Sequence, residues 1–262
     1  MRRLPLRWIV CLAVLLMATL PAWLVSRVLV PGSAQSVTSM ADNLLNLEAD
    51  RVLLGVDSHL RIAHEVLNGL LAEGASSSPA GQLRLWQDDP VSFETMATVL
   101  TRQSPDIAGV FFGDWRGHFM GVEPHASGAR VSIRNLASED RQVFFAGRPG
   151  DRDRPQATEN RGVEPRIQSW YLRAVEAKSR TFSPLQVAEP RHELLLTLSQ
   201  PVYDDKGVTT AVVGVDLFLA ALTDDLRRQR VSAHAATFIV DEQGILVASS
   251  VEDALIREAG QG

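Results

Sequence analysis

The stretch LTLSQPVYDDKGVTTAVVGVDL, residues 196–217, places two largely apolar runs on either side of a short polar segment. That segment opens with Asp204 and closes with Gly207, a choice of residues typical of a tight turn. Runs of this length that are rich in Val, Leu and Thr and are joined by such a turn indicate a β-hairpin. The stretch therefore predicts two long antiparallel strands.

The same plan occurs twice more along the chain. IAGVFFGDWRGHFMGV (residues 107–122) and ATFIVDEQGILVASS (residues 236–250) each carry an Asp-x-x-Gly segment between apolar runs, beginning at Asp114 and at Asp241. Hairpins set between helical segments predict an α+β fold, in which an antiparallel sheet is flanked by helices. We expect the first two hairpins of the chain to share one sheet and the third to begin a second, smaller module.

The third hairpin is followed by a short tail that ends in IREAGQG. A single two-stranded hairpin is only marginally stable in water. We therefore expect residues 232–262 to be the start of an incomplete module, and the chain to be a fragment of a longer protein.

The N-terminal segment is strongly apolar. Three Arg residues precede residues 9–25, which contain no charge and, at about 1.5 Å per helical residue, nearly cross a bilayer core. We expect residues 8–30 to form a transmembrane helix and residues 1–7 to lie in the cytoplasm, because positive flanks stay inside. The alternative is a cleaved signal peptide, in which the small residues Gly32 and Ala34 form the cleavage site.

The segment after this apolar run has helical periodicity. Its apolar residues lie three, four or seven positions apart, at Leu45, Val52, Val56, Leu60, Ala63, Leu67 and Leu70. A helix of nearly 40 residues is about 60 Å long, too long for one element of a small domain, so we expect a stalk helix over residues 31–75. The alternative is two helices broken near Gly55. The stripe from Val52 to Leu67 favours a parallel homodimer of stalk helices.

Residues 76–231 are expected to form the main, membrane-distal module. It is entered through GASSSPAG (residues 74–81), a composition that indicates a loop. A shorter helix is expected over residues 93–103, before the first hairpin.

Composition excludes several classes of protein. The 26 Lys and Arg against 31 Asp and Glu give a net charge of −5, and without the four Arg residues in and around the apolar segment the remainder is near −9 (22 minus 31). An acidic body without a basic stripe argues against nucleic-acid binding. Cys11, the one cysteine, lies in the apolar segment, so the rest of the chain can form neither a disulfide nor a cysteine metal site.

Motifs for catalysis are absent from the sequence. It contains no nucleophile elbow, P-loop, dinucleotide-binding fingerprint or zinc-protease motif. Asp114 and His118 can approach each other across their tight turn, but no nucleophile accompanies them, so the turn interpretation is favoured. We expect no catalytic activity, no metal and no cofactor in this chain.

Two features suggest a binding site. RIQSWYLRAVEA (residues 166–177) places Trp170 and Tyr171 side by side at the start of an expected helix, and Asp216 interrupts an apolar run over residues 211–219. A carboxylate on a buried strand costs several kcal/mol unless a cation or hydrogen-bond donors meet it. Two interpretations stay open: Asp216 caps the helix that follows, or it faces a pocket and holds a ligand ammonium.

The order of these features, from the stalk helix through the GDWRGHF hairpin, EPRIQSWY and GVTTAVVGVDLFL to ATFIVDEQGILVASS, resembles the double Cache sensor domain of bacterial transmembrane receptors. The resemblance covers residues 36–262 and implies a PAS-like, membrane-distal module that binds small ligands, often amino acids or amines. It also implies that the membrane-proximal module is truncated here. In this family a Trp-Tyr pair and a later Asp line the pocket, and they correspond to Trp170, Tyr171 and Asp216.

The sequence departs from the amino-acid-binding version of that family. That version has an Arg two residues before the Trp and a Tyr five residues before that Arg, where this chain has Gln168 and Val163. Losing a charge-assisted partner for a carboxylate costs about 1.5–3 kcal/mol. Arg166 is a candidate substitute, although it corresponds to the structural Arg of the family. We therefore expect a ligand with a cationic amine and no carboxylate, bound against Trp170.

The resemblance implies an extracytoplasmic small-molecule sensing module of a bacterial transmembrane signal transducer. We expect it to be anchored in the inner membrane with its body in the periplasm, and to form a homodimer. The missing output domain is expected to be a nucleotide cyclase, a diguanylate cyclase, a kinase or a chemotaxis transducer. The alternative is a membrane-anchored periplasmic binding or scaffolding protein without an output domain.

Overall fold

The computed structural model describes residues 6–71, 79–135, 140–152, 155–159, 164–188, 193–228, 235–241 and 244–251. The chain divides into two compact units, Met1–Leu54 and Gly55–Gly262. Helix α1 (Leu6–Leu70) covers the segments expected as membrane span and stalk. It continues through Gly55, so the alternative of two helices broken there is wrong. Within the described residues, no helix combines the length and the apolar character needed to cross a membrane.

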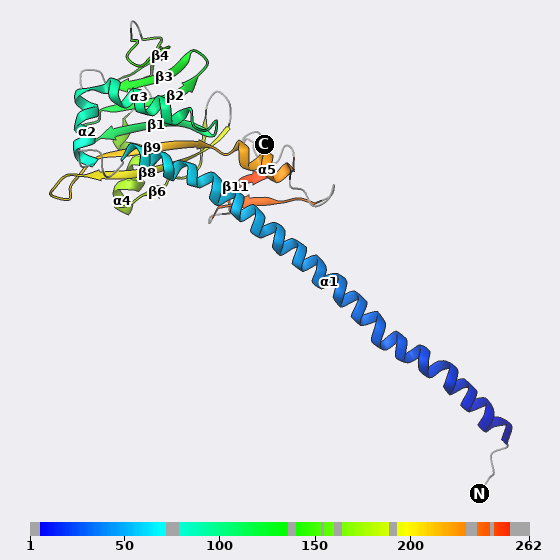
Figure 1. The fold of residues 1–262 in the computed structure, drawn as a ribbon. Helices are drawn as coiled ribbons and strands as arrows, with labels where there is room; N and C mark the ends of the chain where they lie inside the picture. Colours follow the sequence, from blue (N-terminus) through cyan, green and yellow to red (C-terminus); the bar gives the residue numbers. More distant parts are fainter. Residues whose placement is uncertain are drawn as a thin grey trace, which may run out of the picture. The chain divides into compact units, whose positions relative to one another are not determined.

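The centre of the second unit is a nine-stranded antiparallel sheet with the order β5-β4-β3-β2-β1-β9-β8-β6, in which β7 also pairs with β8 (Figure 1). The strands are β1 (Ile107–Asp114), β2 (Phe119–His125), β3 (Gly128–Arg134), β4 (Arg141–Ala146), β5 (Ala157–Glu159), β6 (Thr181–Phe182), β7 (Gln186–Ala188), β8 (Glu193–Tyr203) and β9 (Thr209–Phe218). The first two predicted hairpins are therefore β1–β2 and β8–β9. They share this sheet through the β1–β9 pair, which confirms the prediction.

The third predicted hairpin forms a separate two-stranded sheet of β10 (Phe238–Val240) and β11 (Leu246–Ser249). Helix α5 (Ala220–Arg228) precedes it and contacts β11. The expected α+β class, with an antiparallel sheet and flanking helices, is confirmed.

The three hairpins turn in the same way. In each one the Gly N–H donates to the Asp carbonyl at 3.0 Å, and the Gly has a positive φ that favours glycine. The Asp carboxylate also accepts the backbone N–H of the fourth residue after it. The three bonds run from His118 to Asp114 (2.9 Å), from Val208 to Asp204 (2.8 Å) and from Ile245 to Asp241 (2.8 Å). The Asp-x-x-Gly motif therefore specifies these turns through both its residues.

One face of the large sheet is covered by the end of α1, α2 (Pro79–Asp88) and α3 (Pro90–Thr101). Helix α2 begins inside the stretch expected to be a loop, because Pro79 fits the first turn of a helix. Helix α3 begins three residues before the expected start, with Pro90 in its first turn and the Asp89 carboxylate accepting the Val91 N–H at 3.2 Å. Both boundary predictions were wrong because a Pro opened each helix.

The end of α1 is part of this core. Ala63 and Leu67 are both 0% exposed and pack with residues of the sheet. The expectation that they belong to a dimer stripe is therefore wrong, because the sheet already covers them. The large apolar side chains that remain exposed on α1 lie earlier in the helix and include Met40, Leu44, Leu47 and Leu54.

The opposite face of the sheet is covered by the 3₁₀ helix η1 (Pro165–Ile167) and helix α4 (Ser169–Ala177). Strand β9 divides its side chains between the two faces. Ala211, Val213, Val215 and Leu217 belong to the core under α1, α2 and α3, whereas Val212 packs with α4. Because side chains alternate along a strand, Gly214 and Asp216 lie on the α4 side together with Val212.

Candidate ligand-binding site

Glycines in three adjacent strands make room for aromatic rings on the α4 side of the sheet. At each of these glycines an added Cβ atom would lie 3.0 Å or less from a ring atom. The pairs are Gly214 with Phe111 (2.4 Å), Gly113 with Trp170 (2.9 Å) and Gly121 with Phe119 (3.0 Å). The rings therefore lie directly against the backbone of the sheet, where any larger residue would displace them.

These three rings form one cluster. Phe111 contacts Trp170 edge to face, with 4.8 Å between the ring centroids, and its ring lies 5.9 Å from that of Phe119. The hydroxyl of Ser199 on β8 donates to the Trp170 carbonyl at 2.9 Å, which fixes the start of α4 on the sheet. The Trp predicted to be important is thus held both by packing and by a buried hydrogen bond.

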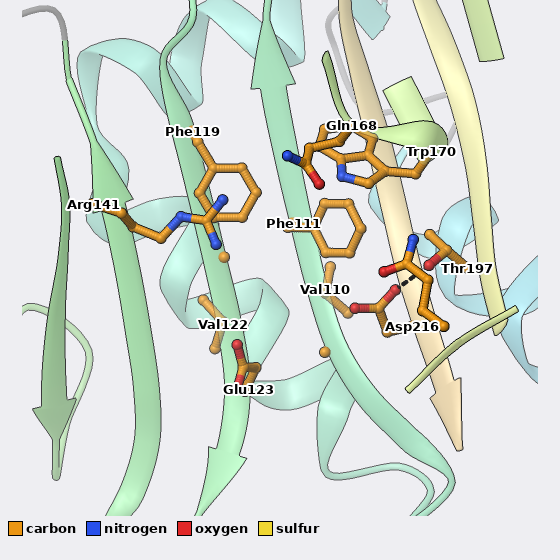
Figure 2. A pocket seen from close by; sticks show the side chains of 13 residues that line it. Val110, Phe111, Phe119, Val122, Glu123, Arg141, Gln168, Trp170, Thr197 and Asp216 are labelled. Carbon is orange, nitrogen blue, oxygen red and sulfur yellow. Dashed lines mark hydrogen bonds between the residues drawn. The ribbon is translucent and has the colours of Figure 1, made fainter. Parts of the chain in front are cut away.

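A cavity of about 150 Å³ opens beside this cluster (Figure 2). Its wall includes Phe111, Phe119 and Trp170, and its polar side chains are Glu123, Arg141, Gln168, Gln186, Thr197 and Asp216. These residues come from six strands and from the turn before α4, so the sheet brings together segments that are far apart in the sequence.

Asp216 lies in the middle of β9, opposite Gly109 of β1 and Thr197 of β8. The Thr197 hydroxyl donates to the carboxylate at 2.6 Å, and no described ion pair includes this group. Burial raises the pKa of Asp216 to about 7; the Thr197 hydrogen bond opposes this shift and the Glu123 charge adds to it.

The helix-cap interpretation of Asp216 finds no support among the described hydrogen bonds. Helix α5 begins at Ala220, and the hydrogen bond described for the Asp216 side chain comes from Thr197 on the neighbouring strand. The carboxylate instead borders the cavity.

A second group of charges lies across the cavity, around β3 and β4. Arg130 contacts Glu123 at 2.6 Å and makes a still closer contact with Glu159, while Arg141 lies 3.7 Å from Glu159. The Arg141 guanidinium lies over the Phe119 ring, with its Cζ 4.0 Å from the ring centroid. Burial raises the pKa of Glu123 and lowers that of Arg141.

Of the six residues proposed from the sequence, Gln168, Trp170 and Asp216 line the cavity. Val163 lies outside the described residues. Arg166 is exposed and is not among the lining residues; its Nε donates to Glu164 at 2.7 Å, which ties the turn before α4 to itself.

Tyr171 is buried but is not among the lining residues. It packs edge to face on Trp170, with 5.6 Å between the ring centroids. Burial raises the pKa of its phenol, and the nearby Asp114 charge adds to that shift. The ring therefore faces the β1–β2 turn more than the cavity.

Sequence reasoning missed Arg141, Glu123 and Thr197. Thr197 had a usable signal, because Thr197 and Ser199 alternate with leucines on β8 and so mark a polar face. Arg141 had none, since it begins a strand whose place four strands away from β9 depends on the sheet order.

Comparisons with known proteins agree with this fold. No protein-family model matches the chain. Adenylate cyclase 1 of Rhizobium meliloti (strain 1021) is 27% identical over 159 residues, which are 54% of this chain and 23% of that protein. The chain thus spans less than a quarter of the length of this relative.

Solved structures give a wider match. The ligand-binding domain of the Campylobacter jejuni chemoreceptor Tlp3 in complex with L-valine has a TM-score of 0.56 at 13% identity, over 86% of this chain and 77% of that chain. The ligand-binding domain of the Pseudomonas fluorescens chemoreceptor CtaA in complex with L-isoleucine has a TM-score of 0.51 at 16% identity, over 86% of this chain and 75% of that chain. The predicted resemblance is confirmed at the level of the fold: the chain has the fold of the Cache-type ligand-binding domains of bacterial chemoreceptors.

Proposed function

We propose that this chain is the extracytoplasmic sensing module of a bacterial transmembrane signal transducer, and that its cavity binds a small molecule through a cationic amine. The observation that carries the proposal is the Asp216 carboxylate, which borders a cavity and has Thr197 as its described hydrogen-bond donor. A ligand ammonium placed against this group supplies the missing positive charge.

The energetics of the free protein favour such a ligand. An ionised carboxylate surrounded by protein is costly without a cation, which is why the pKa of Asp216 is raised. An ammonium that pairs with Asp216 removes this cost, so binding energy comes from a strain already present in the free protein. The neighbouring faces of Phe111 and Trp170 suit the alkyl part of an amine.

The size of the cavity limits the ligand. A cavity of about 150 Å³ has the volume of an engineered protein cavity that binds benzene. The ligand is therefore a small molecule rather than a peptide or a large cofactor. The similarity to receptor domains bound to valine and isoleucine supports this size class.

For location, we propose that residues 8–30 anchor the chain in the inner membrane with its N-terminus inside and its body in the periplasm. The uncharged run over residues 9–25 behind three Arg residues supports this topology. A periplasm-dependent reporter fused after Leu71 should be active. Activity of a cytoplasm-dependent reporter at the same point would contradict the topology.

For assembly, we propose a parallel homodimer through the exposed stripe of α1. Met40, Leu44, Leu47 and Leu54 are exposed at spacings of four, three and seven, the pattern of a coiled-coil seam. Cysteines at Leu44 or Leu47 should crosslink between chains in membranes. A cysteine at the exposed Asp42, on the other side of the helix, is the matched control and should not.

For output, we propose a nucleotide cyclase among the four kinds of domain considered. The similarity to an adenylate cyclase over 159 residues supports this choice. Because the match covers 23% of that relative, the output activity belongs to sequence outside it. Reading the gene beyond codon 262 tests the choice, since a cyclase domain should follow.

The amine proposal is tested by a thermal-shift screen of alkyl amines, amino acids and carboxylates on the full chain in detergent micelles, wild type beside Asp216→Asn. Amines should stabilise the wild type, and Asp216→Asn should weaken their binding by about ten- to a hundredfold, the worth of a charge-assisted hydrogen bond. A set of hits that are all indifferent to Asp216→Asn would overturn the assignment.

A further inference from the structure

We propose that Arg141 forms a second, anion-binding subsite of the same cavity, so that the ligand is a zwitterion whose two charges lie at opposite ends of a short chain. This inference rests on the proposed function, because it leaves the ammonium at Asp216. It adds a second recognition group that the sequence analysis did not identify, and it defines the spacing between the two ligand charges.

The placement of the Arg141 side chain is the first argument. It starts from the first residue of β4, and its guanidinium lies over the Phe119 ring of β2, at the cavity wall (Figure 2). The N–H donors of a guanidinium lie in its plane, so stacking on an aromatic face uses none of them. The ring therefore holds the guanidinium in place while its edge can still donate to a carboxylate or another planar anion.

The charges around Arg141 are the second argument. Arg130 makes the close contacts with both Glu123 and Glu159, whereas the Arg141–Glu159 distance is 3.7 Å. These two arginines and two glutamates balance one another, and Asp216 adds a negative charge outside that balance. A zwitterion brings one charge of each sign, so it can meet Asp216 and Arg141 without adding net charge to the cavity.

The separation of the two subsites is the third argument. The guanidinium lies over β2, and Asp216 lies on β9, two strands further along the order β2-β1-β9. Neighbouring strands are about 4.8 Å apart, so the two subsites are separated by roughly 10 Å at the level of the backbone. In Figure 2 Arg141 and Asp216 lie on opposite sides of Phe111.

This separation selects a class of ligand. In an α-amino acid both charged groups are attached to one carbon, so such a molecule cannot engage Asp216 and Arg141 together across this distance. An ω-amino acid carries the same two groups at the ends of its chain. Gln168, at the position where the related receptors are expected to hold their carboxylate-binding Arg, provides no charge, and Arg141 supplies it from the other side.

Four compounds of matched size test the proposal: 5-aminopentanoate, its isomer 2-aminopentanoate, pentylamine and pentanoate. Their affinities are measured by calorimetry on the full chain in detergent micelles. We expect 5-aminopentanoate to bind most tightly. Arg141→Gln and Asp216→Asn should each weaken it by about ten- to a hundredfold, and Arg141→Gln should leave pentylamine unchanged.

Two further variants serve as controls. Arg173→Gln removes a charge from the exposed side of α4 and should leave all four affinities unchanged. Arg141→Lys keeps the charge but loses the planar fork, so it should weaken 5-aminopentanoate less than Arg141→Gln does. If Arg141→Gln does not fold, Arg141→Lys alone decides, because it must still weaken 5-aminopentanoate relative to pentylamine.

The outcomes separate this inference from the proposed function. Binding of pentylamine as tight as that of 5-aminopentanoate, dependent on Asp216 but not on Arg141, would overturn the anion subsite and leave the amine proposal standing. Preference for 2-aminopentanoate would overturn the charge separation. Binding of pentanoate that depends on Arg141 but not on Asp216 would overturn both the zwitterion and the amine. Absence of binding by all four would also overturn the zwitterion.

Discussion

The two faces of the large sheet are built from the same strands but have different chemistry. On the face under α1, α2 and α3, Val110, Phe112 and Val215 are among the apolar side chains that close the core. On the α4 face, the neighbouring positions Phe111 and Asp216 border a cavity. Alternation along each strand thus lets one set of residues stabilise the fold and leaves the other set for binding.

Two aspartates show the same contrast in detail. Asp114 is fully buried, and its carboxylate accepts from the Gln87 amide at 2.8 Å, the His118 ring at 2.7 Å and two backbone N–H groups of its own turn. Asp216 accepts from Thr197. A carboxylate surrounded by donors builds structure, whereas one with a single donor beside a cavity is suited to a ligand.

The largest expected effect is on the closed face. Phe112 packs between Trp86 and Phe93, with ring centroids 5.9 and 4.9 Å away. Phe112→Ala should therefore lower the free energy of unfolding by about 3–5 kcal/mol, measured by denaturant titration. A loss below about 1 kcal/mol would mean that this face is not the principal core.

A smaller loss is expected where the sheet meets the aromatic cluster. A Cβ at Gly214 would lie 2.4 Å from the Phe111 ring, so Gly214→Ala should lower the free energy of unfolding by about 1–3 kcal/mol and weaken ligand binding. The control is Gly55→Ala in α1, where nothing lies within 4 Å of the added atom. That change should stabilise the helix by about 0.5–1 kcal/mol. Equal effects of the two changes would contradict the packing described.

The stability of the free protein should depend on the ionisation of Asp216. Its folded pKa is about 7 against an ordinary value of 3.8, so its favourable contribution is complete below about pH 4 and is lost as the pH rises through 7. Asp216→Asn should therefore stabilise the free protein at about pH 8 relative to pH 5, by on the order of 1 kcal/mol, since solvent in the cavity screens the charge. Thermal unfolding at the two pH values measures it. A loss of stability at about pH 8 would show that the charge already has a strong partner.

The smallest expected effect is at Tyr171. Because this side chain is not among the residues that line the cavity, Tyr171→Phe should change amine affinity by less than about twofold, in a calorimetric titration. Trp170→Ala should weaken binding much more, since it removes part of the wall. A large loss with Tyr171→Phe would mean that the phenol reaches the ligand.

Local chemistry made parts of this structure predictable from the sequence. The Asp-x-x-Gly turns were predictable because each holds its own Asp and Gly contacts within five residues. Asp216 stood out because a charge interrupts an apolar strand. The strand order was not predictable, and so neither was the approach of Arg141 to Phe119 from two strands away. Tyr171 was grouped with Trp170 by adjacency, although neighbouring helix residues point in different directions.

The most direct test of the account is the pH dependence of pentylamine binding to the full chain, wild type beside Asp216→Asn, measured by calorimetry between about pH 5 and pH 8. The amine stays charged throughout, whereas Asp216 is protonated below its pKa of about 7. The account predicts that wild-type affinity falls by about tenfold per pH unit below pH 7, and that the affinity of Asp216→Asn is weak and flat. Affinity that is the same in both proteins, or independent of pH in the wild type, would contradict the central role of Asp216.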